Sequence, residues 1–102
     1  MDADGIHFTQ TDIGQKIRGP SGTIDNLRDS LANGYNPLNI EPIRIYKDGN
    51  TGIIYSLDNR RLWAAKEAGA QINVRLATDA EIHKAWGAGK SPGGITINVR
   101  DH

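Results

Sequence analysis

Residues 58–61, with the sequence Asp-Asn-Arg-Arg, are the side chains of this chain best suited to binding an anion. They follow an apolar run that predicts a strand, and they open a segment that predicts a helix ending at Ala68, with Asp58 as its N-cap. The first N–H groups of a helix have no intrahelical acceptor, and the helix dipole is positive at that end. A phosphate is favoured there, and the planar guanidinium of arginine donates two parallel hydrogen bonds to it. The segment therefore predicts a phosphate-binding site.

The same residues also permit an interpretation without a ligand. Arg60 and Arg61 can be solvated, or they can pair with Asp58 or Glu67. Two cations in the first turn of a helix oppose the helix dipole unless an anion faces them. The pattern alone favours these two interpretations equally.

Other catalytic patterns do not fit the sequence. Residues 87–91, Gly-Ala-Gly-Lys-Ser, are not a P-loop, because Lys84 stands where that motif requires its first glycine and a proline follows. We expect a loop there, of the glycine-rich kind that can close over a ligand. His7, His83 and His102 do not have the spacing of metal ligands, and neither a Ser-His-Asp pattern nor a nucleophile elbow is present. We expect no metal and no cofactor.

Composition and charge narrow the function classes. The 102 residues carry 12 basic and 12 acidic side chains, so the formal net charge is zero, which disfavours non-specific binding to nucleic acid. Cysteine is absent, which excludes disulfides and thiol catalysis. No apolar run is long enough to span a bilayer, and the N-terminus does not resemble a signal peptide. Residues 1–102 are expected to form a single domain, with residues 1–5 as a disordered cut end.

The apolar periodicity predicts elements in the order β, α, β, β, α, β, α, β. The predicted segments are a strand at 6–10, a helix at about 24–33, a β-hairpin over 43–57, a helix to residue 68, a strand at 72–76, a helix to about residue 86 and a strand at 95–99. The last helix begins with a Thr78–Glu81 capping box. The fold class is therefore α/β (α+β), a small mixed sheet with helices packed on it. The expected core residues are Leu27, Leu31, Ile43, Ile45, Ile53, Leu57, Leu62, Ala65, Ile72, Val74 and Leu76.

Taken together, four segments resemble the C-terminal toxin domains of bacterial polymorphic toxins that have the ParB/sulfiredoxin-like fold. The segments are Phe8-Thr9-Gln10, residues 40–45, residues 55–62 with Leu-Asp-Asn-Arg-Arg-Leu, and residues 93–100. The sequence departs from the wider superfamily in having no glycine at the start of the 58–61 element and no sulfiredoxin cysteine, and it lacks the DNA-binding helical domain of ParB. The resemblance implies the ParB/sulfiredoxin-like fold without sulfiredoxin chemistry.

Some domains of this type resemble effector NAD(P)+ glycohydrolases, and this is the activity that we expect. Nicotinamide leaves a cationic glycoside as a neutral group, so the enzyme has mainly to hold the ribose and stabilise an oxocarbenium-like transition state. The start of the helix would hold the pyrophosphate. The expected catalytic residues are Arg60, Asp58 and Gln10. The expected ligand-binding residues are Asn59, Arg61, Thr9, Arg44 and Thr96.

Two alternatives remain open at this point. A ParB-like nuclease acting on RNA or DNA would use His7 or Lys90 as a base near an arginine, and a non-catalytic nucleotide-binding module would need only the arginine pair. The resemblance also implies that the domain is delivered as the C-terminal part of a larger secreted effector and acts in the target-cell cytoplasm. A dedicated immunity protein is the expected macromolecular partner, and no membrane partner is expected.

Overall fold

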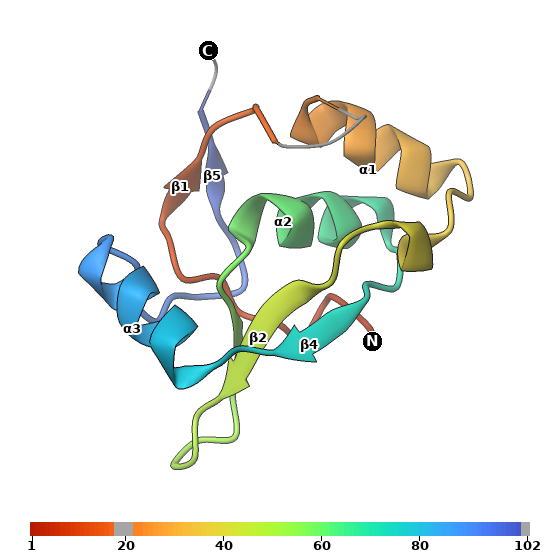
Figure 1. Ribbon diagram of the computed structural model, residues 1–102. Helices are drawn as coiled ribbons and strands as arrows, with labels where there is room; N and C mark the ends of the chain where they lie inside the picture. Colours follow the sequence, from red (N-terminus) through yellow and green to blue (C-terminus); the bar gives the residue numbers. More distant parts are fainter. Residues whose placement is uncertain (18–21, 101–102) are drawn as a thin grey trace.

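Helix α2 occupies the middle of the fold, with helix α1 on one side of it and strands β2 and β4 on the other (Figure 1). The computed structural model describes residues 1–17 and 22–100. In chain order the elements are β1 (Asp12–Ile13), α1 (Ile24–Ala32), the 3-10 helix η1 (Pro37–Asn39), β2 (Ile43–Lys47), β3 (Ile54–Ser56), α2 (Asn59–Ala68), β4 (Val74–Leu76), α3 (Asp79–Gly87) and β5 (Asn98–Val99). The described chain is therefore a small mixed α/β domain, which confirms the predicted class.

The larger sheet has the strand order β3-β2-β4. Strands β2 and β3 form the predicted antiparallel hairpin, with Tyr46 opposite Tyr55. Strand β4 runs parallel to β2 on its other side, with Arg44 opposite Arg75. A second, smaller sheet pairs β1 with β5 in parallel (Figure 1). Because residues paired across strands share a face of the sheet, the β2–β4 register puts two arginines side by side.

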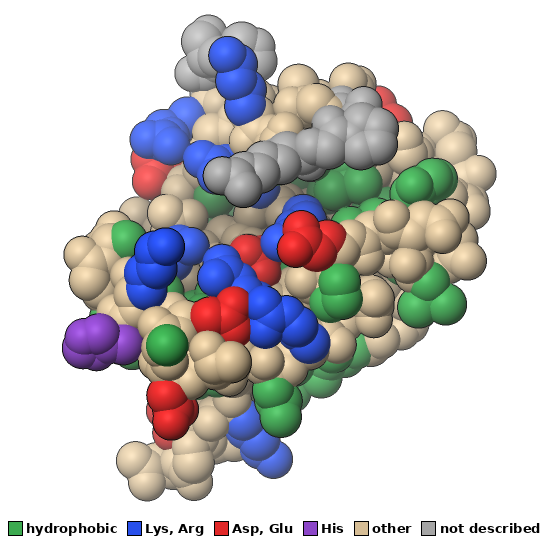
Figure 2. Space-filling model, viewed as in Figure 1, with side chains coloured by type: hydrophobic (Ala, Val, Ile, Leu, Met, Phe, Trp, Pro, Cys, Tyr) green, Lys and Arg blue, Asp and Glu red, His purple; other side chains and the backbone are tan. Residues whose placement is uncertain are grey.

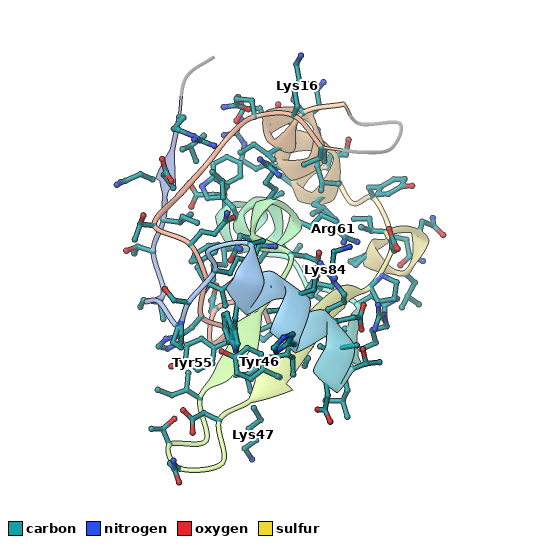
Figure 3. The ribbon with its side chains drawn as sticks, turned by 60° about the vertical axis from the view of Figure 1, so that its left-hand side comes forward. Lys16, Tyr46, Lys47, Tyr55, Arg61 and Lys84 are labelled. Atoms are coloured by element: carbon teal, nitrogen blue, oxygen red, sulfur yellow. The ribbon has the colours of Figure 1, made fainter. Side chains whose placement is uncertain are left out.

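The alternation along β2 divides its side chains between the two faces of the sheet. Ile43 and Ile45 are buried in the core, whereas Arg44 and Tyr46 are half-buried on the opposite face. Tyr46 stacks on the Tyr55 ring at a centroid distance of 5.2 Å and meets the Trp86 ring of α3 edge-on at 5.5 Å. Figure 3 shows both tyrosines beside α3. Helix α3 therefore covers part of the sheet face that carries Arg44.

The helix boundaries follow the expected capping residues. The Thr23 side chain accepts a hydrogen bond from the Asn26 backbone N at the start of α1. Helix α2 ends at Gly69, whose φ of 64° lies in the left-handed region that favours glycine. Thr78 and Glu81 form the predicted capping box at the start of α3. The predictions of these helices are confirmed to within one residue at their ends.

The strands at the two ends of the chain differ from the prediction. The predicted strand over residues 6–10 does not form. Within this segment, His7 makes an isolated β-bridge with Tyr55, and a single bridge does not extend into a strand. The alternation there reflects packing instead, since Ile6 and Phe8 are buried in the core. The predicted strand at 95–99 shortens to β5, and its partner β1 has no apolar alternation to reveal it, since it is only two residues long.

The core also differs from the expected set at its edge. Leu76 is wrong as a core residue, because it ends the edge strand β4 and is 76% exposed; Ile53 and Val74 are only half-buried. The other predicted core residues are buried. The N-terminal residues contribute unexpectedly, since Ala3 is buried and the Met1 amino group donates to the Ile72 carbonyl at 3.1 Å. Within the described part of the chain, no helix is long and apolar enough to cross a membrane.

Candidate phosphate-binding site

Asp58 precedes α2 and occupies the N-cap position, but its side chain makes no capping hydrogen bond, so the predicted capping role is wrong. The carboxylate turns toward β2 instead. Its Oδ2 atom accepts from the Arg44 backbone N at 2.7 Å and from Arg44 Nε at 3.1 Å, and Oδ1 accepts from Arg44 Nη2 at 2.9 Å. The first N–H groups of α2 therefore have no side-chain acceptor among residues 1–17 and 22–100.

Arg61 binds the same carboxylate from the helix side. Its Nη2 atom lies 3.2 Å from Asp58 Oδ1, and its Nη1 atom donates to the Glu41 carbonyl at 2.6 Å. Figure 3 shows Arg61 extending from α2 toward the segment that leads into β2. Burial favours a raised pKa for Asp58, but the hydrogen bonds from Arg44 and the charge of Arg61 hold that pKa below its usual value. Asp58 is therefore ionised at neutral pH, and it fixes two arginines.

Glu81 of α3 extends this group of paired charges across the sheet. Its two carboxylate oxygens accept from Arg75 Nη1 and Nη2 at 2.8 and 2.7 Å, in the fork geometry of a bidentate pair. Glu81 Oε2 also lies 3.6 Å from Arg44 Nη1. The hydrogen bonds from Arg75 lower the Glu81 pKa. The carboxylate thus separates the charges of the two arginines that the strand register places side by side.

Arg60 and Lys90 differ from these paired residues. Arg60 is exposed, and its Nε atom donates to the Gly14 carbonyl at 3.2 Å. Lys90 is half-buried, and its Nζ atom donates to the Leu57 carbonyl at 2.8 Å. Burial lowers the Lys90 pKa, and the charges of Arg44 and Arg60 lower it further, against the opposing charge of Asp58. Neither side chain has a carboxylate partner within the described ranges, so both are available to an anion.

Asn59 connects the start of α2 to the segment that precedes β1. Its side chain is buried; Oδ1 accepts from the Thr9 backbone N at 2.8 Å, and Nδ2 donates to Thr9 Oγ1 at 3.0 Å and to Gln10 Oε1 at 3.1 Å. Thr9 is also buried and donates through Oγ1 to the Ser56 carbonyl at 2.8 Å. These two residues are therefore used in holding Gln10 in place beside the helix.

An open cavity of about 690 Å³ brings most of these residues together. Ligand-binding clefts commonly have this size. Five cationic side chains and three carboxylates line it, so the lining carries two more positive than negative charges. These residues are Arg44, Arg60, Arg61, Arg75, Lys90, Glu41, Asp58 and Glu81. Charged side chains of both signs gather over α2 and α3 on the face shown in Figure 2. In a chain of zero net charge, this local excess makes the cavity a candidate site for an anion.

Most of the predicted site residues converge here. The six that line the cavity are Gln10, Arg44, Asp58, Asn59, Arg60 and Arg61. Thr9 lies beneath it, bonded to Asn59. Thr96 is exposed and does not line the cavity. Of the alternative bases, Lys90 lines the cavity, whereas His7 donates from Nδ1 to the Gly93 carbonyl at 2.9 Å and packs edge-on against Tyr55.

The glycine-rich segment predicted as a loop over 87–94 is a loop from residue 88 onward, since Gly87 is the last residue of α3. Its second half is joined to the segment before β1 by backbone hydrogen bonds from Ser91 N to the Thr9 carbonyl and from Gly93 N to the Phe8 carbonyl, each 2.9 Å long. These bonds hold the loop, and Lys90 with it, against the cavity. Lys90 and Glu81 both line the cavity, although the sequence analysis did not predict either of them as a ligand-binding residue of the expected glycohydrolase.

Comparison with known proteins adds no further constraint. No protein-family model, no curated protein and no solved structure matches this chain. No group of three or more His, Cys, Asp or Glu side chains suited to a metal ion occurs in the part of the chain that the structure describes.

Proposed function

We propose that the chain hydrolyses NAD(P)+ to nicotinamide and ADP-ribose, with the diphosphate bound between Arg60, Lys90 and the start of α2. The observation that carries this proposal is the excess of two positive charges in the cavity, which matches two side chains, Arg60 and Lys90, that form no ion pair with a carboxylate among the described residues. A dinucleotide diphosphate carries two negative charges at neutral pH. Its oxygens would also meet the uncapped N–H groups of a ten-residue helix.

Beyond binding the diphosphate, the reaction requires the protein to hold the ribose and to admit a water molecule. Cleavage breaks the bond between the ribose C1′ atom and the nicotinamide nitrogen; the bonding electrons leave with nicotinamide, and water adds to C1′ and loses a proton. We assign Gln10 to the ribose, because it lines the cavity and its Nε2 group has no hydrogen-bond partner in the described residues. Asp58 acts in this proposal as a positioning residue, because both of its oxygens are bound by arginines.

The wider context is part of the same proposal. The segments that resemble polymorphic toxin domains lead us to propose a ParB/sulfiredoxin-like fold for this small α/β domain. We also propose delivery as part of a larger effector, action in the cytoplasm of the target cell, and neutralisation by an immunity protein. Growth arrest on cytosolic expression in bacteria, relieved by the Arg60→Ala substitution, would support this context.

The test of the activity is nicotinamide release from NAD+ and NADP+ by the purified chain. Arg60→Ala should reduce the rate by about 10- to 100-fold, the value of one charged hydrogen bond to phosphate. Arg28→Ala is the matched control, because it removes the same charge from α1 at a residue that does not line the cavity. The control should keep the wild-type rate.

RNA and plasmid DNA incubated in parallel separate the alternatives. Intact NAD(P)+ with degraded nucleic acid would replace the proposal by a nuclease, and Lys90 would then be the base to examine. Intact NAD(P)+ and intact nucleic acid would reduce it to nucleotide binding without hydrolysis. An Arg60→Ala variant as active as the wild type would remove the phosphate assignment.

A further inference from the structure

The cavity has a second end, here called the apolar end, that the phosphate site leaves unused. Six lining residues come from the chain around α1 and η1. Four of the six are apolar or aromatic, namely Ile17, Leu27, Tyr35 and Ile40, and the other two are Asn39 and Glu41. Figure 1 shows α3 and its following loop on one side of the start of α2, and η1 with the end of α1 toward the other side. The cationic and apolar parts of the lining therefore come from different parts of the fold.

Tyr35 is the aromatic residue of this apolar end. Tyr35 is accessible to a ligand, because the residue is 43% exposed and lines the cavity. Its backbone is fixed, because Gly34 ends the helical turn with a φ of 95° and Tyr35 N donates to the Ser30 carbonyl at 2.9 Å. An exposed aromatic ring on a fixed backbone loses little freedom when a planar group stacks on it.

We infer that Tyr35 stacks on the adenine base of a nucleoside diphosphate whose phosphates lie at Arg60 and Lys90. This inference rests on the proposed function for the orientation of the dinucleotide. The scissile nicotinamide ribose lies near Gln10, which is bonded to Asn59 at the polar end, so the adenine is the base left for the apolar end. Ile40, which is half-buried, and the buried Leu27 line the same cavity as Tyr35.

The experiment measures binding, so it does not depend on hydrolysis. Affinities of wild type, Tyr35→Ala and Tyr35→Phe are determined by calorimetry for ADP and for inorganic pyrophosphate. Stacking of a base on an aromatic ring contributes about 1–3 kcal/mol, so Tyr35→Ala should weaken ADP binding by about 5- to 100-fold and leave pyrophosphate binding unchanged. Tyr35→Phe keeps the ring and should bind ADP like the wild type.

Several outcomes would overturn the inference. They are equal ADP affinity in Tyr35→Ala and wild type, an equal loss for ADP and pyrophosphate, and no ADP binding by the wild type at millimolar concentration. Nicotinamide mononucleotide provides the last arm, because its affinity should not respond to Tyr35→Ala if its base lies at the polar end. Tyr35-dependent ADP binding without NAD(P)+ hydrolysis would keep this inference and reject the proposed function. Hydrolysis of NAD(P)+ without Tyr35-dependent ADP binding would keep the proposed function and reject this inference.

Discussion

Arg60 and Arg61 are neighbours in the sequence but lie in different electrostatic surroundings. They leave α2 about 100° apart around the helix axis. Arg61 is 20% exposed and is held by the Asp58 carboxylate and the Glu41 carbonyl. Arg60 is exposed, and its one hydrogen bond to the described residues goes to the Gly14 carbonyl. The position around the helix axis therefore determines whether each arginine binds the Asp58 carboxylate or remains available to a ligand.

The same division applies to the whole cavity. Its paired part contains three carboxylates, each within ion-pair distance of at least one arginine. The pairs of Asp58 and Glu81 connect β2, β4, α2 and α3, and Glu41 lies 3.7 Å from Arg61 Nη1. Its unpaired part contains Arg60 and Lys90, which donate to backbone carbonyls and form no ion pair with a carboxylate in the described chain. Substitutions in the first part should change stability, and substitutions in the second should change ligand affinity. The predictions below test that separation.

The largest expected effect is the loss of stability in Asp58→Ala. This substitution removes the carboxylate from Arg44 and Arg61 and the acceptor from the Arg44 backbone N. Breaking a buried pair on one side is strongly destabilising, but Arg44 and Arg61 are partly solvated, so we expect about 2 to 3 kcal/mol. Urea unfolding monitored by tryptophan fluorescence gives the value.

Asp25→Ala is the matched control for that experiment. Asp25 pairs with Arg28 on the exposed surface of α1, and such pairs contribute about 0 to 1 kcal/mol. Equal losses in the two variants would mean that the paired part of the cavity adds no more than a surface ion pair, and the comparison would fail.

The second prediction compares alanine substitutions of the two neighbouring arginines. Arg60→Ala should weaken pyrophosphate binding by about 10- to 100-fold and change the free energy of unfolding by less than about 0.5 kcal/mol. Arg61→Ala should lower stability by about 1 to 2 kcal/mol, because it leaves Asp58 and the Glu41 carbonyl with fewer donors. Calorimetry and urea unfolding on the same preparations separate the two effects. The opposite pattern would reverse the roles of Arg60 and Arg61.

The third prediction displaces Lys90 without changing a charge. A Cβ atom on Gly93 would lie 2.8 Å from the Phe8 carbonyl oxygen, whereas one on Gly94 would meet no atom within 4 Å. Gly93→Ala should therefore shift the loop that carries Lys90 and lower stability by about 1 to 2 kcal/mol, with weaker pyrophosphate binding. Gly94→Ala is the control and should match the wild type in both measurements. Unchanged binding in Gly93→Ala would show that the loop does not position Lys90.

Much of this architecture follows from local patterns in the sequence. The helices could be predicted because their capping residues act locally, as Thr23 and the Thr78–Glu81 pair do. The anion site could be placed at residues 58–61 because a helix start has the same unpaired N–H groups in any fold. The two-residue strand β1 could not be found, because two residues carry no periodicity.

The division of the charges depended on contacts distant in the sequence. Nothing local indicates that Asp58 turns away from its helix toward Arg44, since that choice depends on β2 lying beside the helix start. Likewise, Glu81 has an obvious local role as a capping residue, and its pairing with Arg75 follows only from the parallel register of β2 and β4. Sequence reasoning therefore identified most of the residues that line the cavity, but it could not tell which of the lining cations lack a carboxylate partner among the described residues.

The smallest expected effect concerns the pH dependence of binding through Lys90. Its pKa lies below the usual lysine value of 10.5 because of burial and the charges of Arg44 and Arg60. Lys90 binds an anion only when protonated, so ADP affinity should be constant near neutral pH and fall by about 3- to 10-fold as the pH rises through that lowered pKa. Arginine stays protonated throughout this range, so Lys90→Arg should lose the pH dependence and keep the affinity. A decline of the same size in Lys90→Arg would assign the titration to another group, and the binding data would then support Arg60 alone of the two unpaired cations in the described lining.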